Sequence, residues 1–268
     1  MYQINIDYEI KPKARDLRGS AGGRKIDALC AQSGDTIKAM LDVIESSAWF
    51  ASITPDEPSD PYAPFWFNSW FPPLDEMSLA AMLKENNPET YLEVGSGNST
   101  KFARRAVSED KLRTKIISID PFPRAEIDQI CDEVIRTPLE DLESNAFANL
   151  RAGDVVFIDN SHRSFMNSDV TVFFTEILPS LPSGVIYGMH DIFLPDDYHQ
   201  IWADRYYNEQ YLLAMYLLGG AAGDKILFPA SYVARHSVFR ERLRKYGARI
   251  GLPDLHNLGT GCFWLRRK

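Results

Sequence analysis

The residues with the clearest capacity for chemistry form a short glycine turn, Glu93-Val94-Gly95-Ser96-Gly97-Asn98-Ser99-Thr100. The turn follows an apolar strand predicted over 90–94 and opens a helix predicted over 99–107. In this context backbone N–H groups can approach a bound ligand, because glycine has no Cβ to block the approach or disfavour the backbone conformation. Asp120 ends the next predicted strand, where a carboxylate can accept hydrogen bonds from both hydroxyls of a ribose. Together the two features predict a nucleoside site.

A second group of polar residues combines two carboxylates with two imidazoles, and it consists of Asp159, His162, His190 and Asp191. Each pair follows an apolar run that predicts a buried strand, and the carboxyl ends of neighbouring parallel strands meet at one edge of a sheet. Such a set could hold a divalent cation through Asp159, His190 and Asp191, or could supply a general base. Because imidazole suits Mn²⁺, Fe²⁺ or Zn²⁺ better than Mg²⁺, a metal-free alternative in which His190 or His162 acts alone stays open. His162, His190 and Asp159 are the candidate catalytic residues.

Strands and helices alternate along most of the chain. Strands are predicted over 90–94, 115–119, 133–136, 154–158 and 184–189, and helices over 75–86, 99–107, 124–131, 139–147, 165–178 and 205–218. Strand-like segments follow at 225–233 and 262–265. Such alternation is typical of βαβ units and predicts an α/β fold with a doubly wound, mostly parallel sheet over residues 74–268.

Residues 1–73 are expected to form an N-terminal helical and irregular extension. Residues 18–25 are small and basic, which indicates a linker or a mobile arm, and Asp35 can cap a helix that runs to Ser47. Between Trp49 and Pro73 lie eight aromatic residues and six prolines, a composition that fits neither a regular helix nor a central strand. This segment is either an irregular strap packed on the core or a lid over a substrate pocket.

Composition limits the class of protein. The 268 residues are 45% hydrophobic, which is typical of a folded globular chain, and the net charge is −8. A net-acidic surface repels phosphate backbones, so we expect no nucleic-acid partner. The longest apolar stretch, beginning at Tyr211, is too short to span a bilayer, so no membrane partner is expected either. Three cysteines without a CxxC pair and an N-terminus without a cleavage signature indicate a cytoplasmic protein. Residues 211–218 are apolar on nearly all sides, which suggests burial or a homodimer contact.

The form of the glycine turn discriminates between nucleoside ligands. A dinucleotide site requires a third glycine where this chain has Thr100, which disfavours NAD. The pattern E-x-G-x-G-x-S-T instead resembles motif I of the class I S-adenosylmethionine (SAM)-dependent methyltransferases. Residues 157–162 together with Asp169 are similar to the "IDG-x-H…D" stretch of the small-molecule O-methyltransferase branch that includes macrocin O-methyltransferase-like and cephalosporin hydroxylase-like proteins. Residues 184–192 resemble that branch's "GG-x-x-x-x-HD" strand end, although Ser183 and Asn160-Ser161 depart from its glycines.

The resemblance implies a role for each matching residue. Glu93, Gly95, Ser96 and Gly97 would contact the methionine part of SAM, and Asp120 would hold the ribose. Pro121 and Phe122 would lie beside the adenine, with Thr137 as a further contact. Asp159, His162, His190 and Asp191 would face the reaction centre, and Asp159 would also contact the cofactor. The implied function is SAM-dependent methyl transfer to a small-molecule acceptor, at a hydroxyl oxygen rather than a nitrogen, with a divalent cation such as Mg²⁺ or Mn²⁺ as an optional second cofactor.

Two alternatives remain at this point. One is an NAD-dependent oxidoreductase, and the other is a nucleoside-binding domain without catalytic activity. Glu209 and Gln210 could line the acceptor pocket, but a position on a helix surface is the more conservative expectation for both, as a structural role is for Asp169.

Overall fold

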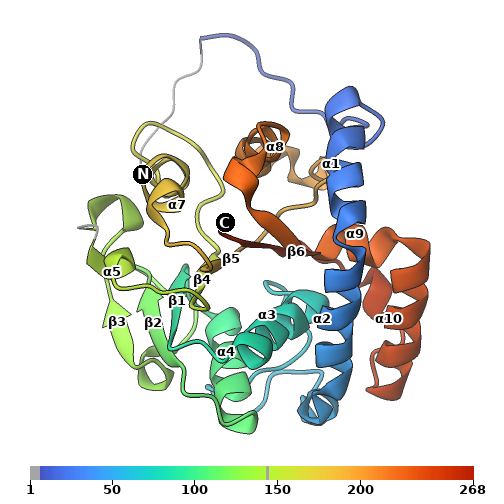
Figure 1. Cartoon of the computed structure of the whole chain (residues 1–268). Coiled ribbons are helices and arrows are strands. Elements are labelled where there is room, and N and C mark those ends of the chain that lie inside the picture. The colour runs from blue at the N-terminus through green and yellow to red at the C-terminus, as the bar shows by residue number, and fades with distance from the viewer. Residues whose placement is uncertain (1–6, 143–144) are drawn as a thin grey trace.

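The structure, a computed structural model, describes residues 7–142 and 145–268. Its strands form one mixed sheet in the order β3-β2-β1-β4-β5-β7-β6 (Figure 1). The strands of the described residues are β1 (Thr90–Val94), β2 (Lys115–Ile119), β3 (Glu133–Ile135), β4 (Val155–Ile158), β5 (Ile186–Met189), β6 (Lys225–Pro229) and β7 (Phe263–Arg266). Strands β1 to β5 run parallel, and β7 lies antiparallel between β5 and β6. The expected α/β fold with a mostly parallel sheet is therefore confirmed.

Helices cover both faces of this sheet. In the described residues they are α1 (Ala21–Gln32), α2 (Gly34–Ser46), α3 (Pro73–Asn86), α4 (Asn98–Glu109), α5 (Asn145–Ala148), α6 (Asp169–Val172), α7 (Leu178–Ser180), α8 (Glu209–Leu218), α9 (Ala230–Arg235) and α10 (Ser237–Arg249). Helices α3 and α4 pack on one face, and α7 and α8 lie on the other (Figure 1). None of the helices in the described part of the chain combines the length and the apolarity that crossing a bilayer requires.

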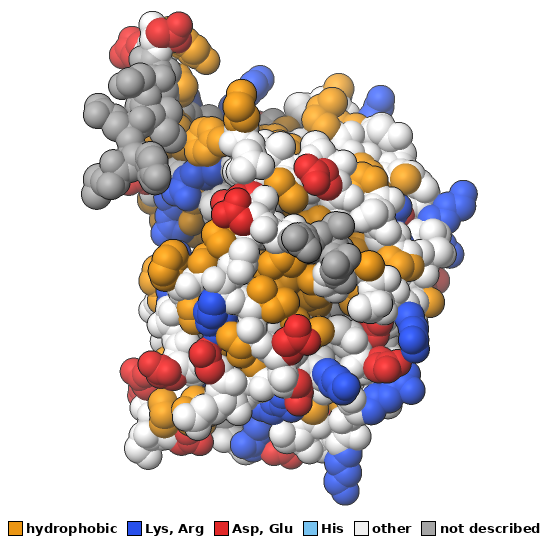
Figure 2. Space-filling model, turned by 90° about the vertical axis from the view of Figure 1, so that its left-hand side faces the viewer, with side chains coloured by type: hydrophobic (Ala, Val, Ile, Leu, Met, Phe, Trp, Pro, Cys, Tyr) orange, Lys and Arg blue, Asp and Glu red, His pale blue; other side chains and the backbone are white. Residues whose placement is uncertain are grey.

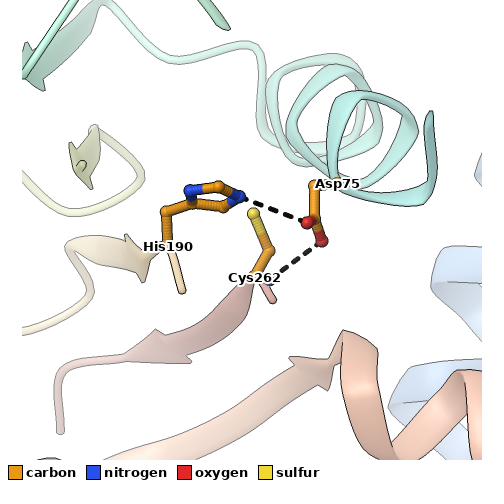
Figure 3. A group of neighbouring side chains, drawn as sticks. All are labelled: Asp75, His190 and Cys262. Atoms are coloured by element: carbon orange, nitrogen blue, oxygen red, sulfur yellow. Dashed lines mark hydrogen bonds and ion pairs between the residues drawn. The ribbon is translucent and has the colours of Figure 1, made fainter. Parts of the chain in front are cut away.

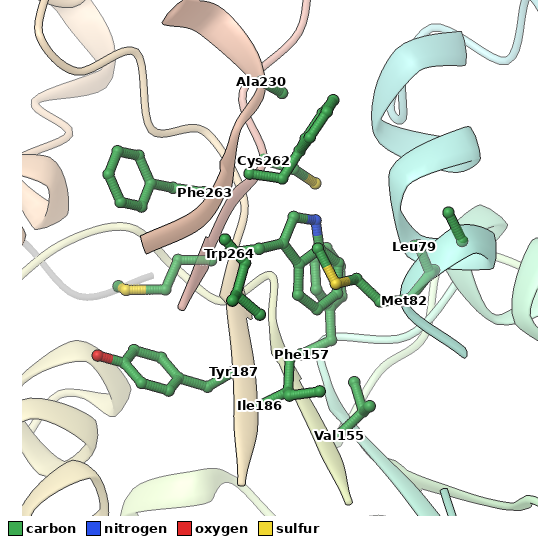
Figure 4. Packing of buried hydrophobic residues seen from close by; sticks show 14 of the residues in the cluster. Leu79, Met82, Val155, Phe157, Ile186, Tyr187, Ala230, Cys262, Phe263 and Trp264 are labelled. Carbon is green, nitrogen blue, oxygen red and sulfur yellow. The ribbon is translucent and has the colours of Figure 1, made fainter. Parts of the chain in front are cut away.

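Buried side chains of β4, β5 and β7 pack against those of α3 (Figure 4). The Trp264 ring stacks on Phe157 with 5.3 Å between ring centroids, and its Nε1–H donates to the Ser78 hydroxyl at 2.9 Å. A Cβ added to Gly188 would lie 2.5 Å from the Trp264 ring, so only glycine leaves room for that ring on β5. This packing fixes the carboxyl ends of β4 and β5, which carry the second polar group.

The N-terminal extension is more ordered than the sequence suggests. The predicted mobile arm over 18–25 is wrong, because helix α1 begins at Ala21 and the Ser20 hydroxyl caps it by accepting from the Gly23 N–H at 3.0 Å. Gly23 is a packing residue, since a Cβ there would lie 1.8 Å from the Leu17 carbonyl oxygen. Helix α1 packs on α8, and α2 packs on α3.

Four other predicted segments differ from the structure. The predicted strand 225–233 ends at Pro229, where α9 begins, as is common for a proline next to a helix N-terminus. The helix predicted over 165–178 begins only at Asp169, since Ser168 caps it there. The helix predicted over 124–131 is reduced to the 3₁₀ turn Asp128–Ile130. The helix predicted over 139–147 consists of the 3₁₀ turn Leu139–Asp141 and α5, and residues 143–144 lie outside the described residues.

The aromatic segment between Trp49 and Pro73 contributes to the core. Trp66 is 2% exposed and packs on Phe102 of α4 and on Phe50, with ring centroids 5.4 and 6.0 Å away. Phe71, near the end of the segment, lies 5.0 Å from the ring of His190. The segment thus packs as an irregular strap at Trp66, and its last aromatic residue reaches the second polar group.

We predict that Trp66→Ala lowers the free energy of unfolding by about 3–5 kcal/mol, the cost of removing a large buried aromatic side chain from a core. Phe67→Ala is the matched control, because Phe67 is the next residue and is 50% exposed, so its loss should change stability by less than about 0.5 kcal/mol. Chemical denaturation monitored by circular dichroism measures both values. Equal losses for the two variants would show that Trp66 is not a core residue.

Candidate active site

The glycine turn leaves the end of β1 in a conformation that glycine favours. Gly95 has φ +82°, and a Cβ there would lie 1.7 Å from the carbonyl oxygen of Asp159, so both the backbone and the neighbouring loop require glycine. A Cβ added to Gly97 would meet no atom of the described chain within 4 Å. Gly95 therefore serves the packing of the protein itself, whereas Gly97 borders open space in which a ligand can approach the turn.

The side chain of Glu93 stabilises the glycine turn through hydrogen bonds. Its carboxylate is fully buried and accepts hydrogen bonds from the Tyr91 hydroxyl at 2.9 Å and from the Thr100 hydroxyl. The Gly97 N–H donates to the same Thr100 oxygen at 3.0 Å. Burial raises the pKa of Glu93 to about 7, although hydrogen bonds from Ser99, Thr100 and Tyr91 act to lower it. Thr100 therefore has a structural use for its hydroxyl at the position where a dinucleotide site has glycine.

Asp120 ties the turn to the loop after β2. Its Oδ2 accepts from the Ser96 N–H and its Oδ1 from the Phe122 N–H, both at 2.8 Å. The carboxylate is only half-buried, and each oxygen has a second lone pair with which to accept a ribose hydroxyl. Pro121 is half-buried, and Phe122 is 86% exposed, so its ring is open to contact by a planar base.

Sequence reasoning missed Arg136, which follows β3. Its guanidinium donates to the Asp120 carbonyl oxygen at 2.9 Å and to the Ser118 hydroxyl at 3.2 Å. Ser118 in turn shares a 2.7 Å hydrogen bond with the Ser96 hydroxyl. Arg136 thereby links the ends of β2 and β3 to the glycine turn. No local motif marks it, because only the parallel pairing of the strands brings it there.

Thr137, the expected adenine-side residue, lines a cavity of 530 Å³ beside β2 and β3. Ile117, Ile135 and Leu142 give this cavity an apolar wall. The face of the molecule that carries β3 shows hydrophobic side chains gathered near its centre (Figure 2). Thr137 therefore faces space that an apolar or planar group can enter.

The second polar group comes together at the ends of β4 and β5, as the sequence predicted. The His162 Nε2 lies 3.3 Å from a carboxylate oxygen of Asp159 and 3.4 Å from one of Asp191. The His190 Nδ1 lies 3.2 Å from Asp159 and 3.6 Å from Asp191. Each of the two carboxylates therefore faces both imidazoles.

Two further carboxylates reach the outer sides of these imidazoles, and sequence reasoning assigned neither of them to the site. Glu209 of α8 is fully buried, and its Oε2 lies 2.9 Å from the His162 Nδ1. Its expected position on a helix surface is thus wrong, because the first turn of α8 points into the protein. Asp75 of α3 lies 3.3 Å from the His190 Nε2 (Figure 3).

Asp75 is itself firmly held. Its carboxylate accepts from the Thr260 hydroxyl at 2.6 Å and from the N–H groups of Gly261 and Cys262 at 2.7 and 2.8 Å. These three donors come from the chain that leads into β7. Asp75 therefore joins the start of α3 to the last strand by hydrogen bonds, and the same carboxylate lies at ion-pair distance from His190.

The charges in this group stabilise one another. Burial acts to raise the pKa of Asp159, but the neighbouring His190 and His162 outweigh it and hold that pKa below its ordinary value. Burial acts to lower the pKa of His162, yet its bonds to Asp159 and Glu209 raise it well above 6.5. The pKa of His190 is also raised well above 6.5, because the nearby Asp191 and Asp159 outweigh the effect of burial. Carboxylates and imidazoles thus alternate in this group, and each favours the charged form of its neighbours.

The backbone around these residues is held in uncommon conformations. His162 has φ +58° and Asp191 has φ +55°, in the left-handed region that costs a residue with a side chain about 1 kcal/mol or more. The loop after β4 compensates with its own hydrogen bonds, since Asn160 accepts from the His162 N–H and Asp169 accepts from both the N–H and the hydroxyl of Ser161. Asp169 therefore has a structural role, as expected, and Asn160 has a local one.

A cation site requires several ligand atoms that lie close together. Among the residues that the structure describes, one group of three candidate ligands has its ligand atoms within 4.8 Å of one another: Asp75, His190 and Cys262. Burial and the nearby Asp75 raise the pKa of the Cys262 thiol well above 9.0, and Asp75 already accepts three hydrogen bonds, so this group does not fit a metal. In the arrangement seen here, imidazole rings occupy the space between Asp159 and Asp191. The metal-binding role of Asp159, His190 and Asp191 stays a prediction.

Comparison with solved structures finds proteins of similar chain length. A structure of Podospora anserina methyltransferase PaMTH1 with S-adenosylhomocysteine (SAH) is 13% identical, with a TM-score of 0.44 and coverage of 97% of this chain and 99% of that chain. An O-methyltransferase from Bacillus cereus in complex with SAH is 13% identical, with a TM-score of 0.42 and coverage of 91% and 100%. A CmcI structure described as a Mg–SAM complex is 18% identical, with a TM-score of 0.43 and coverage of 73% and 72%. The search of curated proteins returned no match to this chain.

The comparison with protein families assigns the region that contains both halves of the site. Residues 92–192 match the family described as a methyltransferase domain. This span begins within β1, includes the glycine turn and Asp120, and ends just after His190 and Asp191. Residues 92–192, which include the glycine turn Glu93–Thr100, are therefore similar to a methyltransferase domain.

Proposed function

We propose that this protein transfers the methyl group of SAM to a hydroxyl oxygen of a small-molecule acceptor. The observation that carries the proposal is the contact between the two halves of the site. Gly95 of the glycine turn packs directly on the backbone of Asp159, whose side chain belongs to the carboxylate–imidazole group. A cofactor bound at the turn would therefore lie beside groups that can orient a hydroxyl and accept its proton.

The chain would bind SAM along the ends of β1, β2 and β3. Glu93, Gly95, Ser96 and Gly97 are proposed to hold the methionine part, Asp120 the ribose, and Pro121, Phe122 and Thr137 the adenine side. The open side of Gly97 and the half-buried carboxylate of Asp120 support this orientation. SAM supplies the electrophilic methyl group.

The main contribution of the protein is alignment of two bound reactants. Holding a nucleophile and an electrophile in line can lower a barrier by roughly 7–11 kcal/mol in favourable cases. Asp159, His162 and His190 are the candidates to orient the acceptor hydroxyl and to receive its proton, as general bases do. All three lie at strand ends that the core packing holds in place, so little rearrangement is needed for them to act together.

Neither alternative function has comparable support. An NAD-dependent oxidoreductase is disfavoured because Thr100 uses its hydroxyl to hold Glu93 and Gly97. A binding domain without catalysis would have no evident use for four carboxylates and two imidazoles gathered at the strand ends. A homodimer is also a proposal, supported by Met215 and Leu218 of α8, which are apolar and exposed.

For the cofactor site, Asp120→Ala should weaken SAM binding at least about tenfold. Each hydrogen bond to a charged acceptor is worth roughly 1.5–3 kcal/mol, and about 1.4 kcal/mol corresponds to a factor of ten. Isothermal titration calorimetry with SAM and SAH measures the effect. Asp254→Ala, at an exposed aspartate, serves as the control. Unchanged affinity in Asp120→Ala would remove Asp120 from the site.

For the reaction, we expect SAH formation by the wild-type protein with at least one member of a panel of phenols, sugar hydroxyls and amines, and an O-methylated product by mass spectrometry. His162→Ala should reduce the rate, because it removes a candidate base.

The cation is tested in the same assay after treatment with a chelator. Activity lost with the chelator and restored by Mg²⁺ or Mn²⁺ would support a metal, whereas full turnover in the chelated enzyme would exclude one. Methylation of amines alone would contradict transfer to oxygen.

A further inference from the structure

Helix α8 begins with two buried polar residues that lie outside residues 92–192. Glu209 and Gln210 are both 0% exposed, although they occupy the first turn of a helix whose Met215 is 69% exposed. Burying a charged or polar group costs free energy unless it is hydrogen-bonded. The hydrogen-bond partners of these two side chains therefore indicate the structural role of the first turn of α8.

Glu209 and its neighbour Asn208 hold the loop that follows β4. The His162 Nδ1–H donates to Glu209 Oε2 at 2.9 Å. The His162 carbonyl oxygen accepts from the N–H groups of Asn208 and Glu209 at 2.9 and 3.3 Å, and the Ser164 N–H donates to the Asn208 side chain at 2.7 Å. The backbone and the side chain of His162 are thus both bound to the start of α8.

Gln210 holds the loop that follows β5. Its side-chain oxygen accepts from the Phe193 N–H at 3.0 Å, and its own N–H donates to the Tyr198 hydroxyl at 3.1 Å. Asp191 lies two residues before Phe193, so this bond restrains the segment that carries the Asp191 carboxylate. Consecutive residues of α8 therefore hold the two loops that bring the reactive groups together.

The bond to Glu209 decides how the His162 ring is oriented. With Nδ1 directed at Glu209, the opposite nitrogen Nε2 must face Asp159 and Asp191, at 3.3 and 3.4 Å. A carboxylate on one ring nitrogen is a general means of fixing the tautomer and the orientation of the other. His162 also has a left-handed backbone, which persists only where the surroundings hold it.

We propose that Glu209 and Gln210 are positioning residues of the active site, which set the His162 ring and the loop after β5 against one helix. The inference rests on the proposed function, since it concerns how the acceptor end of that site is held. Neither residue is assigned a contact with SAM, so each should affect the acceptor side of the reaction and leave cofactor affinity unchanged.

The first test follows the imidazole directly in the full-length protein. Nuclear magnetic resonance of ¹⁵N-histidine-labelled protein should show the His162 Nδ1 proton as a slowly exchanging, hydrogen-bonded signal. Glu209→Gln retains an acceptor without its charge and should weaken this protection, and Glu209→Leu should abolish it. Glu176→Gln, the same change at an exposed glutamate, is the control and should leave the signal unchanged.

The second test separates positioning from a general loss of structure. Glu209→Gln should lower kcat at least tenfold, and Glu209→Leu should lower it further, while the Kd for SAM by calorimetry stays within about threefold of wild type. Gln210→Leu should raise the KM for the acceptor and leave the His162 signal intact. Each variant is compared at the same folded fraction, measured by circular dichroism.

Two results would overturn the proposal: a wild-type-like His162 signal in Glu209→Leu, or a loss of SAM affinity as large as the loss of kcat. A wild-type protein that neither binds SAM nor forms SAH would instead contradict the proposed function. The His162 signal would still show in that case whether Glu209 sets the ring, so the two failures are distinguishable.

Discussion

The structure depends on the pairing of buried charges around two imidazole rings. His162 and His190 are almost fully buried, and so are the outer carboxylates of Glu209 and Asp75. A buried charge is costly unless it is paired and hydrogen-bonded, and removing one partner of a buried pair typically costs 3–5 kcal/mol. The ends of β4 and β5 and the starts of α3 and α8 must therefore occupy one mutual arrangement. That arrangement is what makes the group suitable for chemistry as well as stable.

The cofactor half of the site is joined to this group through backbone contacts. The Asp159 N–H donates to the Val94 carbonyl oxygen at 2.8 Å, and the Asp159 carbonyl lies against the Cα of Gly95. Any movement of the glycine turn would therefore displace Asp159. Under the proposed function, this junction would hold the acceptor groups in a fixed position relative to the glycine turn, as in-line transfer requires.

Local sequence predicts the parts of the site that lie next to strands. The glycine turn, Asp120 and the pair His190–Asp191 each follow an apolar run, and parallel strands carry them to one edge. Glu209 could not be found in this way, because it lies 47 positions from His162, and an acidic residue in the first turn of a helix is favourable in solvent as well. Gly23 shows that local sequence is limited in predicting the fold as well. A glycine-rich segment by itself indicates flexibility, whereas the structure shows that Gly23 is needed for close packing against Leu17.

The parts that sequence reasoning missed form the outer support of the acceptor end. Helix α8 holds the loops after β4 and β5, and its far side packs on α1 of the N-terminal extension. Arg18, just before α1, forms a two-pronged pair with Asp196 in the loop after β5. The extension is thus bound to the loop that follows Asp191 both directly and through α8. Residues 92–192 contain Asp159, His162, His190 and Asp191, but contacts from outside that span, with Asp75 and α8, help to set their relative positions.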